Sequence, residues 1–263
     1  MGSVDALFLG ILQGLAEFLP ISSSGHLILL ETWLPLSMDP RSLLAFDILL
    51  HTATALALLL CYAGTWWRIM KSPFTGDRTH RRLLLLLIIA TIPGAIIGAF
   101  FEEAVAGQFR SIASVAVAFL ITSTLLLAAH RARGKLTTER MAWKQALPIG
   151  LMQAVALIPG ISRSGSTISM GQMMGLRREE ALDFSFLMAF PIIVGASLSA
   201  FMDFMSGNVV PLPLAVVLTG FLSSFGVSMI AILLLRRFVA RHSLAWFALY
   251  LVPLAVLLFV FAV

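Results

Sequence analysis

The segment Gln13-Gly-Leu-Ala-Glu-Phe-Leu-Pro-Ile-Ser-Ser-Ser-Gly-His26 places an acid, three serines, a glycine and a histidine within an otherwise apolar part of the chain. Five residues in and just before it recur 140 positions later with the same spacing. The matched residues are Gly10, Gln13, Ser22, Ser24 and Gly25 in the first copy and Gly150, Gln153, Ser162, Ser164 and Gly165 in the second. Such ungapped matches between two polar, loop-like segments are hard to obtain by chance. We therefore interpret the segments as two halves of one site.

The composition indicates that the rest of the chain lies in a membrane. Hydrophobic residues make up 59% of the 263 residues and charged residues only 12%, whereas about a quarter of a soluble domain is charged. The net charge of +5 does not indicate a nucleic-acid partner, because the basic residues occupy short loops between apolar runs. The single cysteine, Cys61, excludes an internal disulfide and a zinc cluster. The N-terminus lacks a basic region, so we expect no cleaved signal peptide.

Six apolar runs approach or exceed the length of about 20 residues that a helix needs to cross a bilayer. They are residues 43–62, 83–101, 112–129, 181–201, 212–235 and 244–263. Shorter apolar runs flank each polar segment, residues 6–20 and 27–36 around the first and 146–158 and 168–176 around the second. Each pair predicts a re-entrant helical hairpin, whose irregular turn is tolerated at membrane depth only where protein or water surrounds it.

The basic residues predict the orientation in the membrane. Most of them lie in four loops, and six spans place all four loops on one face, which the positive-inside rule makes cytoplasmic. Both termini are then outside, the first hairpin enters from the outside and the second from the inside. We therefore predict an all-α polytopic membrane protein with six transmembrane helices and two re-entrant hairpins. Residues 1–263 would form one domain of two inverted-topology repeats, about 1–130 and 145–263, with the ligand site where the hairpins meet.

Arg163 indicates an anionic ligand. A guanidinium in the hydrocarbon zone costs several kcal/mol unless it is paired, and its planar fork of donors suits a phosphate or a carboxylate. The neighbouring hydroxyls add donors, and two glycines let backbone N–H groups approach a ligand at the start of a helix. These neighbours are Gly160, Ser162, Ser164, Gly165, Ser166 and Thr167. The alternative is that Arg163 only pairs with Glu17 and so holds the hairpins together.

Glu17 lies one helical turn after Gln13, so both side chains face the same side of a helix. A carboxylate with an amide oxygen suits a hard divalent cation, Mg²⁺ or Ca²⁺, that shares its coordination with a phosphate. Glu17 could instead be a general base. A third interpretation is a buried acid with only a structural role.

The residues Ser22, Ser23, Ser24 and His26 allow several kinds of chemistry. At least one serine is expected to cap a helix. A serine nucleophile needs an adjacent base, which His26 could supply, and His26 could also attack phosphorus or protonate a leaving group. A purely structural histidine is the alternative, but we favour a chemical role beside this serine-rich turn. Three other polar residues in predicted spans are interpreted as structural support: Asp47, His51 and Asp183.

The two polar segments resemble the motifs of the undecaprenyl-pyrophosphate phosphatase family, the bacitracin-resistance membrane phosphatases. Gln13 to Glu17 is similar to the family motif (Glu/Gln)-x-x-x-Glu, and Pro159 to Thr167 matches Pro-Gly-x-Ser-Arg-Ser-x-x-Thr at every fixed position. The run Phe184 to Pro191 is also similar to the family, and the resemblance covers essentially the whole chain.

The resemblance implies hydrolysis of undecaprenyl diphosphate to the monophosphate at the outer side of the bacterial plasma membrane, which recycles the carrier for peptidoglycan. It implies a divalent cation and an essential set of Glu17, Ser23, His26 and Arg163. Because Gln13 stands where many members have glutamate, Glu17 would hold the cation with phosphate oxygens and water. The predicted substrate-binding residues are Gln13, Ser22, Ser24, Gly25, Gly160, Ser162, Ser164, Gly165 and Thr167.

The sequence leaves the attacking group open between Ser23, His26 and water. In the preferred mechanism Arg163 and the cation neutralise the diphosphate while His26 relays a proton from Ser23 or a water. The rival function is a transporter or flippase of a lipid phosphate or small anion, because broken helices in inverted repeats are typical of transporters. A weaker alternative is a non-catalytic scaffold for envelope enzymes. The expected partners are a polyprenyl diphosphate and membrane lipids, with a possible homodimer and no nucleic acid.

Overall fold

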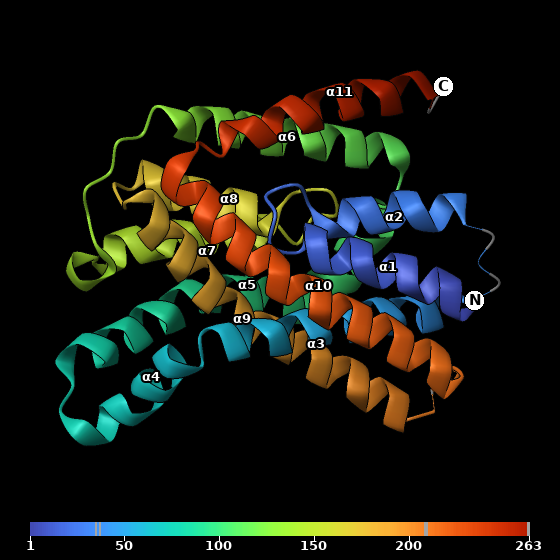
Figure 1. Ribbon diagram of the computed structural model, residues 1–263, viewed down its shortest axis with the longest axis horizontal. Helices are drawn as coiled ribbons and strands as arrows, with labels where there is room; N and C mark the ends of the chain where they lie inside the picture. The colour runs from blue at the N-terminus through green and yellow to red at the C-terminus, as the bar shows by residue number, and fades with distance from the viewer. Residues whose placement is uncertain (35, 37, 208–209, 262–263) are drawn as a thin grey trace.

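The computed structural model describes residues 1–34, 36, 38–207 and 210–261, and these residues form a bundle of helices (Figure 1). In this described part the only bridge is an isolated one between Leu136 and Leu176. The helices are α1 Ser3–Ala16, α2 Ser23–Trp33, α3 Pro40–Cys61, α4 Ala63–Thr75, α5 Arg78–Gln108, α6 Ile112–His130, the 3-10 turn η1 Thr138–Arg140, α7 Trp143–Val155, α8 Arg163–Met173, α9 Arg178–Met205, α10 Leu214–Arg241 and α11 Ala245–Phe261. The predicted all-α class is confirmed.

In the described part of the chain, five helices are long and apolar enough to cross a membrane: α3, α5, α6, α9 and α10. Each contains one of the predicted spans in whole or nearly so. The sixth predicted span, residues 244–263, corresponds to α11, which has 17 residues and is shorter than the other five; residues 262 and 263 lie outside the described part. The chain is a multi-pass membrane protein.

The basic stretch between the predicted spans 43–62 and 83–101 was expected to be one of the four loops, but it is largely helical. Helix α4 follows α3 with only Tyr62 between them. It forms because this stretch is amphipathic: Ile69 and Ser72 are buried, while Lys71 lies 4.2 Å above the ring of the exposed Trp67. Helix α4 ends at Gly76, which adopts the left-handed conformation with a φ of 69°.

A helical hairpin stands at each predicted position, α1–α2 and α7–α8. The four helices have between 11 and 14 residues, too few to span a bilayer. Both second helices begin earlier than predicted, because Ser22 and Ser162 act as N-caps. Ser22 Oγ accepts from the N–H of Gly25 at 3.3 Å, and Ser162 Oγ accepts from the N–H of Gly165 at 3.0 Å. The serines therefore form the first turns of helices, and the recurring residues make the same bonds in both copies.

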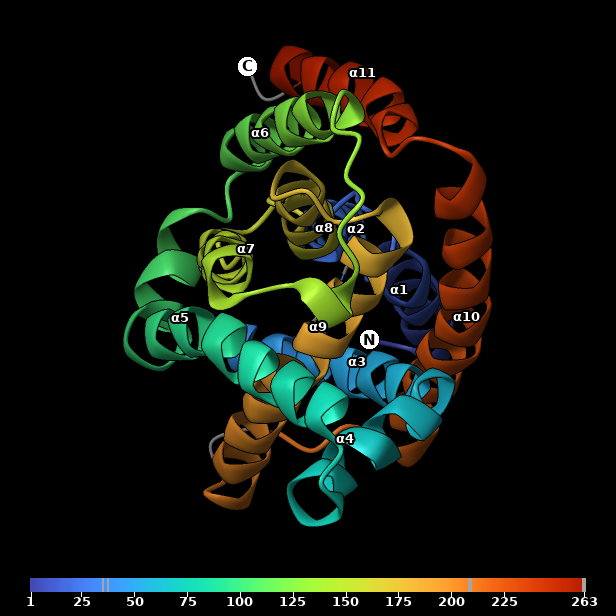
Figure 2. The same cartoon turned by 90° about the vertical axis from the view of Figure 1, so that its left-hand side faces the viewer.

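Each hairpin packs against a long helix of the other half of the chain. A Cβ on Gly10 of α1 would lie 2.6 Å from the carbonyl oxygen of Gly220 in α10. A Cβ on Gly150 of α7 would lie 2.7 Å from Cα of Ala90 in α5. Small residues permit this close approach of backbones, and Figure 2 shows α1 beside α10 and α7 beside α5. The first hairpin thus packs on a helix of the second half, and the second hairpin on a helix of the first half. Two halves related by a two-fold axis would pack in this way. The inverted orientation of the halves stays a prediction.

Candidate active site

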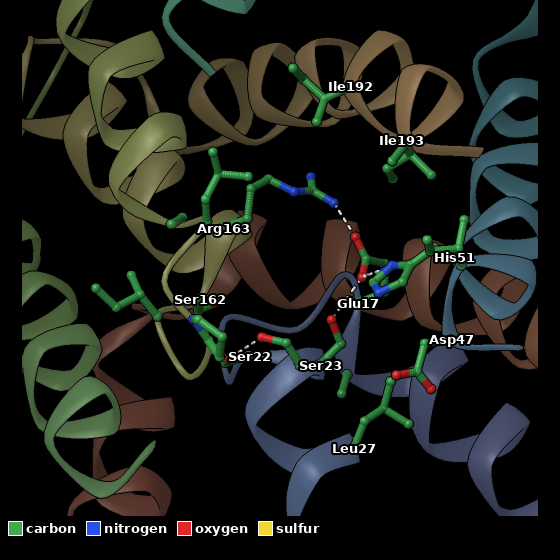
Figure 3. A pocket seen from close by; sticks show the side chains of 18 of the residues that line it. Glu17, Ser22, Ser23, Leu27, Asp47, His51, Ser162, Arg163, Ile192 and Ile193 are labelled. Atoms are coloured by element: carbon green, nitrogen blue, oxygen red, sulfur yellow. Dashed lines mark hydrogen bonds and ion pairs between the residues drawn. The ribbon is translucent and has the colours of Figure 1, made fainter. Parts of the chain in front are cut away.

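The two polar segments meet at a pocket of about 260 Å³ (Figure 3). The N–H of Gly160 donates to Ser24 Oγ at 3.4 Å, and Ser164 Oγ donates to the carbonyl oxygen of Leu19 at 3.0 Å. These bonds join the two turns directly. The pocket wall is completed by the helices α3, α5, α7 and α9, whose side chains there are mainly apolar.

Glu17 is the centre of the polar contacts in this pocket. It follows the last turn of α1 and is 7% exposed. Its Oε2 accepts from Ser23 Oγ at 2.8 Å and from Gln13 Nε2 at 3.0 Å, and it lies 3.1 Å from His51 Nδ1. Its Oε1 pairs with Nη2 of Arg163. One carboxylate thus connects both hairpins and α3, as Figure 3 shows.

Ser23 is the hydroxyl of the first turn of α2 that donates to Glu17. The preceding residue, Ser22, has a φ of 72° and a ψ of 101°, which is a sparsely populated conformation for a residue with a side chain. A backbone in such a region costs about 1–3 kcal/mol and is found mainly at functional sites. In this chain the unusual turn aims Ser23 Oγ at Glu17.

Arg163 is the first residue of α8, so its guanidinium lies beside the positive end of that helix. Nη2 pairs with Glu17, whereas Nη1 is buried without a hydrogen-bond partner among the described residues. A buried donor of a charged group without a partner is costly. The pocket therefore has a free cationic donor in the place where an anionic ligand would be bound.

The sequence comparison assigns the chain to a family. Residues 6–257 match the family described as bacitracin resistance protein BacA. The chain belongs to this family. A relative from Rubrobacter xylanophilus named undecaprenyl-diphosphatase is 40% identical, over 97% of this chain and 96% of its own. Relatives of the same name from Geotalea daltonii and Elusimicrobium minutum are 39% and 36% identical, over 99% and 100% of this chain and 98% and 99% of theirs.

In this member of the BacA family, His26 lies apart from the described residues that line the pocket. Its Nδ1 is 2.7 Å from the carbonyl oxygen of Ser22 and its Nε2 is 2.8 Å from the hydroxyl of Tyr250. A carbonyl oxygen only accepts, so Nδ1 carries the proton and Nε2 accepts from Tyr250. The ring also packs against Phe119 at 5.0 Å. This geometry favours a structural role in holding the turn at Ser22 and gives no support to the predicted proton relay.

The other predicted binding residues divide into two groups. Ser22, Ser24 and Ser162 line the pocket together with the catalytic candidates Glu17, Ser23 and Arg163. The remaining residues support the wall of the pocket from behind: Gln13, Gly25, Gly160, Ser164, Gly165 and Thr167.

Packing contacts, backbone conformation and hydrogen bonds show how residues of this supporting group hold the wall of the pocket in place. Gly25 is packed so closely that an added Cβ would lie 2.6 Å from the ring of Phe119. Gly160 has a φ of 91°, which favours glycine. Thr167 Oγ1 donates to the carbonyl oxygen of Arg163 at 2.7 Å and lies 2.6 Å from Ser185 Oγ. These residues shape the starts of α2 and α8 and do not line the pocket.

His51 and Asp47 line the pocket, although the sequence was interpreted as giving them structural roles. Besides Glu17, His51 Nδ1 lies 2.8 Å from Gln13 Nε2. Nδ1 can donate to the carboxylate or accept from the amide, depending on the ring tautomer, so His51 helps to orient Glu17 and Gln13. The sequence feature that could have predicted a pocket role is the pair Asp47 and His51, two polar residues one helical turn apart in an apolar run. Asp183 lies elsewhere, where its Oδ1 accepts from the Tyr62 hydroxyl at 2.5 Å.

Gln153 is a second pocket residue whose role the sequence did not define. It is the counterpart of Gln13 in the second copy and is 2% exposed. Both its Oε1 and its Nε2 are buried without a hydrogen-bond partner in the described part of the chain. The amide is held against α5, since a Cβ on Gly94 would lie 3.4 Å from Gln153 Nε2. A donor and an acceptor are therefore free in the pocket wall.

The predicted cation site at Glu17 is not favoured by these contacts. Protein groups already engage both of its oxygens, three of them at Oε2 and Arg163 at Oε1. A cation there would have to displace the guanidinium. Among the described residues, no group of three or more His, Cys, Asp or Glu side chains is placed to hold a metal ion. A site in this pocket would thus need phosphate oxygens and water to complete its coordination.

Proposed function

We propose that this protein hydrolyses undecaprenyl diphosphate to undecaprenyl phosphate and inorganic phosphate. Three relatives named undecaprenyl-diphosphatase match it over nearly its full length. The single observation that carries the chemistry is the hydrogen bond of 2.8 Å from Ser23 Oγ to Glu17 Oε2, beside the free donor of Arg163. A hydroxyl bonded to a carboxylate that other groups orient is the arrangement of an activated nucleophile.

In the proposed first step, Ser23 Oγ attacks the terminal phosphorus and its proton passes to Glu17. The bond from this phosphorus to the bridging oxygen breaks, and undecaprenyl phosphate leaves with that oxygen. In the second step, a water attacks the phosphoserine and Glu17 returns its proton to Ser23 Oγ as the P–O bond breaks. The two protons of the water leave with inorganic phosphate. His51 and Gln13 keep the Glu17 carboxylate in position through both steps.

Arg163 would stabilise the charge on the transferred phosphoryl group. Its free Nη1 and the N-terminal end of α8 both face the pocket, where donors placed in advance act most strongly on developing charge. A divalent cation, when bound, would neutralise further charge on the diphosphate. Because four protein groups contact the Glu17 carboxylate, other residues would hold this cation.

An apolar groove beside the pocket supports a lipid substrate. It has a volume of about 400 Å³, lies between α3 and α9, and is lined by side chains such as Phe46, Phe201 and Phe204. Ile48 lines both the groove and the polar pocket. We propose that the isoprenoid chain lies in this groove, because a diphosphate bound at Arg163 would direct its tail through the shared boundary.

The location supported by the sequence is the bacterial plasma membrane, with the active site open to the outer side. Figure 1 shows both termini at the end of the molecule opposite α4. The basic residues Arg78, Arg81 and Arg82 lie in the first turns of α5, which packs against α4, and basic segments remain on the cytoplasmic side.

The test is release of inorganic phosphate from undecaprenyl diphosphate by the purified protein in detergent micelles with Mg²⁺. We expect continuous release without any membrane gradient, and Ser206→Ala, a change of an exposed serine outside the pocket, should keep the wild-type rate. The rival transporter function predicts no release in micelles but movement of the lipid phosphate between the leaflets of reconstituted vesicles. That result from folded protein would overturn the proposal.

A further inference from the structure

A second group of charges lies at the edge of the same pocket. It comprises Glu31 of α2, Asp47 of α3 and Arg110, which lies between α5 and α6. Nη2 of Arg110 is 3.1 Å from Glu31 Oε2 and 4.0 Å from Asp47 Oδ2. Asp47 and Arg110 both line the pocket, and Figure 3 shows Asp47 on the same side as His51. Two carboxylates share one guanidinium, so one negative charge is left uncompensated when both are ionised.

Each carboxylate has one oxygen that Arg110 does not reach. Glu31 Oε1 and Asp47 Oδ1 are buried and have no hydrogen-bond partner among the residues described. The side chain of Glu31 is 7% exposed and that of Asp47 is 10% exposed. Burying a charged acceptor without a partner costs more free energy than burying a neutral one. The two carboxyl groups lie within hydrogen-bonding reach of each other, so either a proton shared between them or a bound cation would compensate these two oxygens.

We propose that Glu31 and Asp47, rather than Glu17, hold the divalent cation of this phosphatase. Mg²⁺ and Ca²⁺ prefer carboxylate oxygens and complete their shells with water and phosphate oxygens. The free oxygens of Glu31 and Asp47 meet that preference, whereas those of Glu17 are bonded to four protein groups. Arg110 remains on the opposite oxygens and limits the excess negative charge.

A cation at this position needs no acid at residue 13. The first polar segment supplies only one carboxylate, Glu17, and Gln13 instead donates to it. The second acid in the pocket comes from α3, where Asp47 lies one helical turn from His51. Helix α3 would then carry both a ligand of the cation and a partner of the catalytic carboxylate. The inference rests on the proposed phosphatase function, so its test measures binding separately from hydrolysis.

The experiment is titration of Mn²⁺ into the purified full-length protein in detergent without substrate, with free Mn²⁺ measured by electron paramagnetic resonance. We expect about one Mn²⁺ per chain, displaced by excess Mg²⁺. The substitutions Asp47→Asn and Glu31→Gln should each weaken binding at least about tenfold, as loss of a group at a metal site does. Glu17→Gln should change the affinity far less, and Glu179→Gln, which alters an exposed acid with its side chain 53% accessible, should leave it unchanged.

Three results would overturn the proposal. Wild-type protein that binds no Mn²⁺ would show that the two carboxyl groups share a proton, the usual alternative for paired acids. Unchanged affinity in Asp47→Asn and Glu31→Gln would exclude these ligands, and loss of binding only in Glu17→Gln would place the cation at Glu17. If Asp47→Asn fails to fold, Glu31→Gln carries the test together with Asp47→Glu, which keeps a carboxylate and should keep binding.

Discussion

The hydroxyl of Ser23 donates to Glu17 Oε2 at 2.8 Å and so links the first turn of α2 to the end of α1. The acid and the hydroxyl are six residues apart, and the turn between them is held by the unusual backbone of Ser22. Arg163 reaches the other oxygen of the same carboxylate from the second hairpin. The first hairpin thus supplies the candidate nucleophile and its base, and the second hairpin adds the cationic donor.

The contact of His26 with Tyr250 predicts a structural effect. Replacing Tyr250 with phenylalanine removes the donor to His26 Nε2 and should lower the free energy of unfolding by about 1 kcal/mol, the net value of one such bond. The rate of phosphate release should stay within about threefold of wild type, because His26 does not contact the reacting groups. A threefold change corresponds to about 0.6 kcal/mol in the activation free energy. Thermal unfolding in detergent and initial rates measure the two effects. A large fall in rate with unchanged stability would instead assign His26 to proton transfer.

Gln153 should show opposite effects on stability and activity. Gln153→Leu replaces two buried polar atoms that lack partners, so the free energy of unfolding should rise or stay equal. The second-order rate constant kcat/KM should fall about tenfold, as expected from losing about 1.4 kcal/mol of contact with bound diphosphate or water. Leucine has nearly the same volume as glutamine, so the substitution removes the polar atoms without changing the bulk of this wall. A destabilised Gln153→Leu protein with normal kcat/KM would contradict this account.

The close packing of α7 on α5 predicts a specific intolerance at Gly150. An added methyl group there would overlap the backbone of Ala90, and overpacking of this kind typically costs about 1–3 kcal/mol. Gly150→Ala should therefore unfold at a lower temperature than wild type. The matched control is Gly195→Ala in α9, where a Cβ meets no described atom within 4 Å and where alanine is the better helix former. Equal stability of the two variants would show that α7 and α5 are less closely packed.

Asp77 should make the start of α5 sensitive to acid. Its Oδ1 accepts from the N–H of His80 at 3.1 Å, and this bond holds the pKa of the Asp77 carboxyl below its ordinary value. The pKa of this carboxyl is thus lower in the folded protein than in the unfolded chain, where it is near 3.9. The bond therefore stabilises the fold fully above that pH, and this stabilisation is lost as the pH falls through the pKa of the folded protein. Amide hydrogen exchange at residues 78–82 should therefore accelerate below about pH 4, after correction for the intrinsic rate. In Asp77→Asn the corrected rates should not depend on pH in this range.

Much of the fold follows from length and hydropathy. Apolar runs predicted five of the long helices because a membrane leaves few alternatives to a helix for satisfying the backbone. The region of α4 was missed because a short amphipathic helix with Arg68 and Lys71 has the composition of a loop. The starts of α2 and α8 were placed too late because serines at N-caps are indistinguishable, by type alone, from serines in turns.

The candidate site was only partly predictable. The meeting of Glu17 with Arg163 followed from the recurring segments, but Ser23 and His26 lie three residues apart and face different surroundings. That difference is set by the φ of Ser22 and by the contact of His26 with Tyr250, which comes from 224 residues away. His51 was assigned to structural support because its contact with Glu17 arises from tertiary packing of α3.

The most direct test of the central claim compares phosphate release from undecaprenyl diphosphate by wild type, Ser23→Ala, Glu17→Gln and the double variant. If Ser23 and Glu17 act as one unit, each single substitution should reduce kcat by about a thousandfold or more, and the double variant should be no worse than the poorer single one. All four proteins should retain their thermal unfolding profiles within a few degrees, so that the rates report chemistry. A Ser23→Ala protein with nearly wild-type kcat would contradict the account and assign the attack to water.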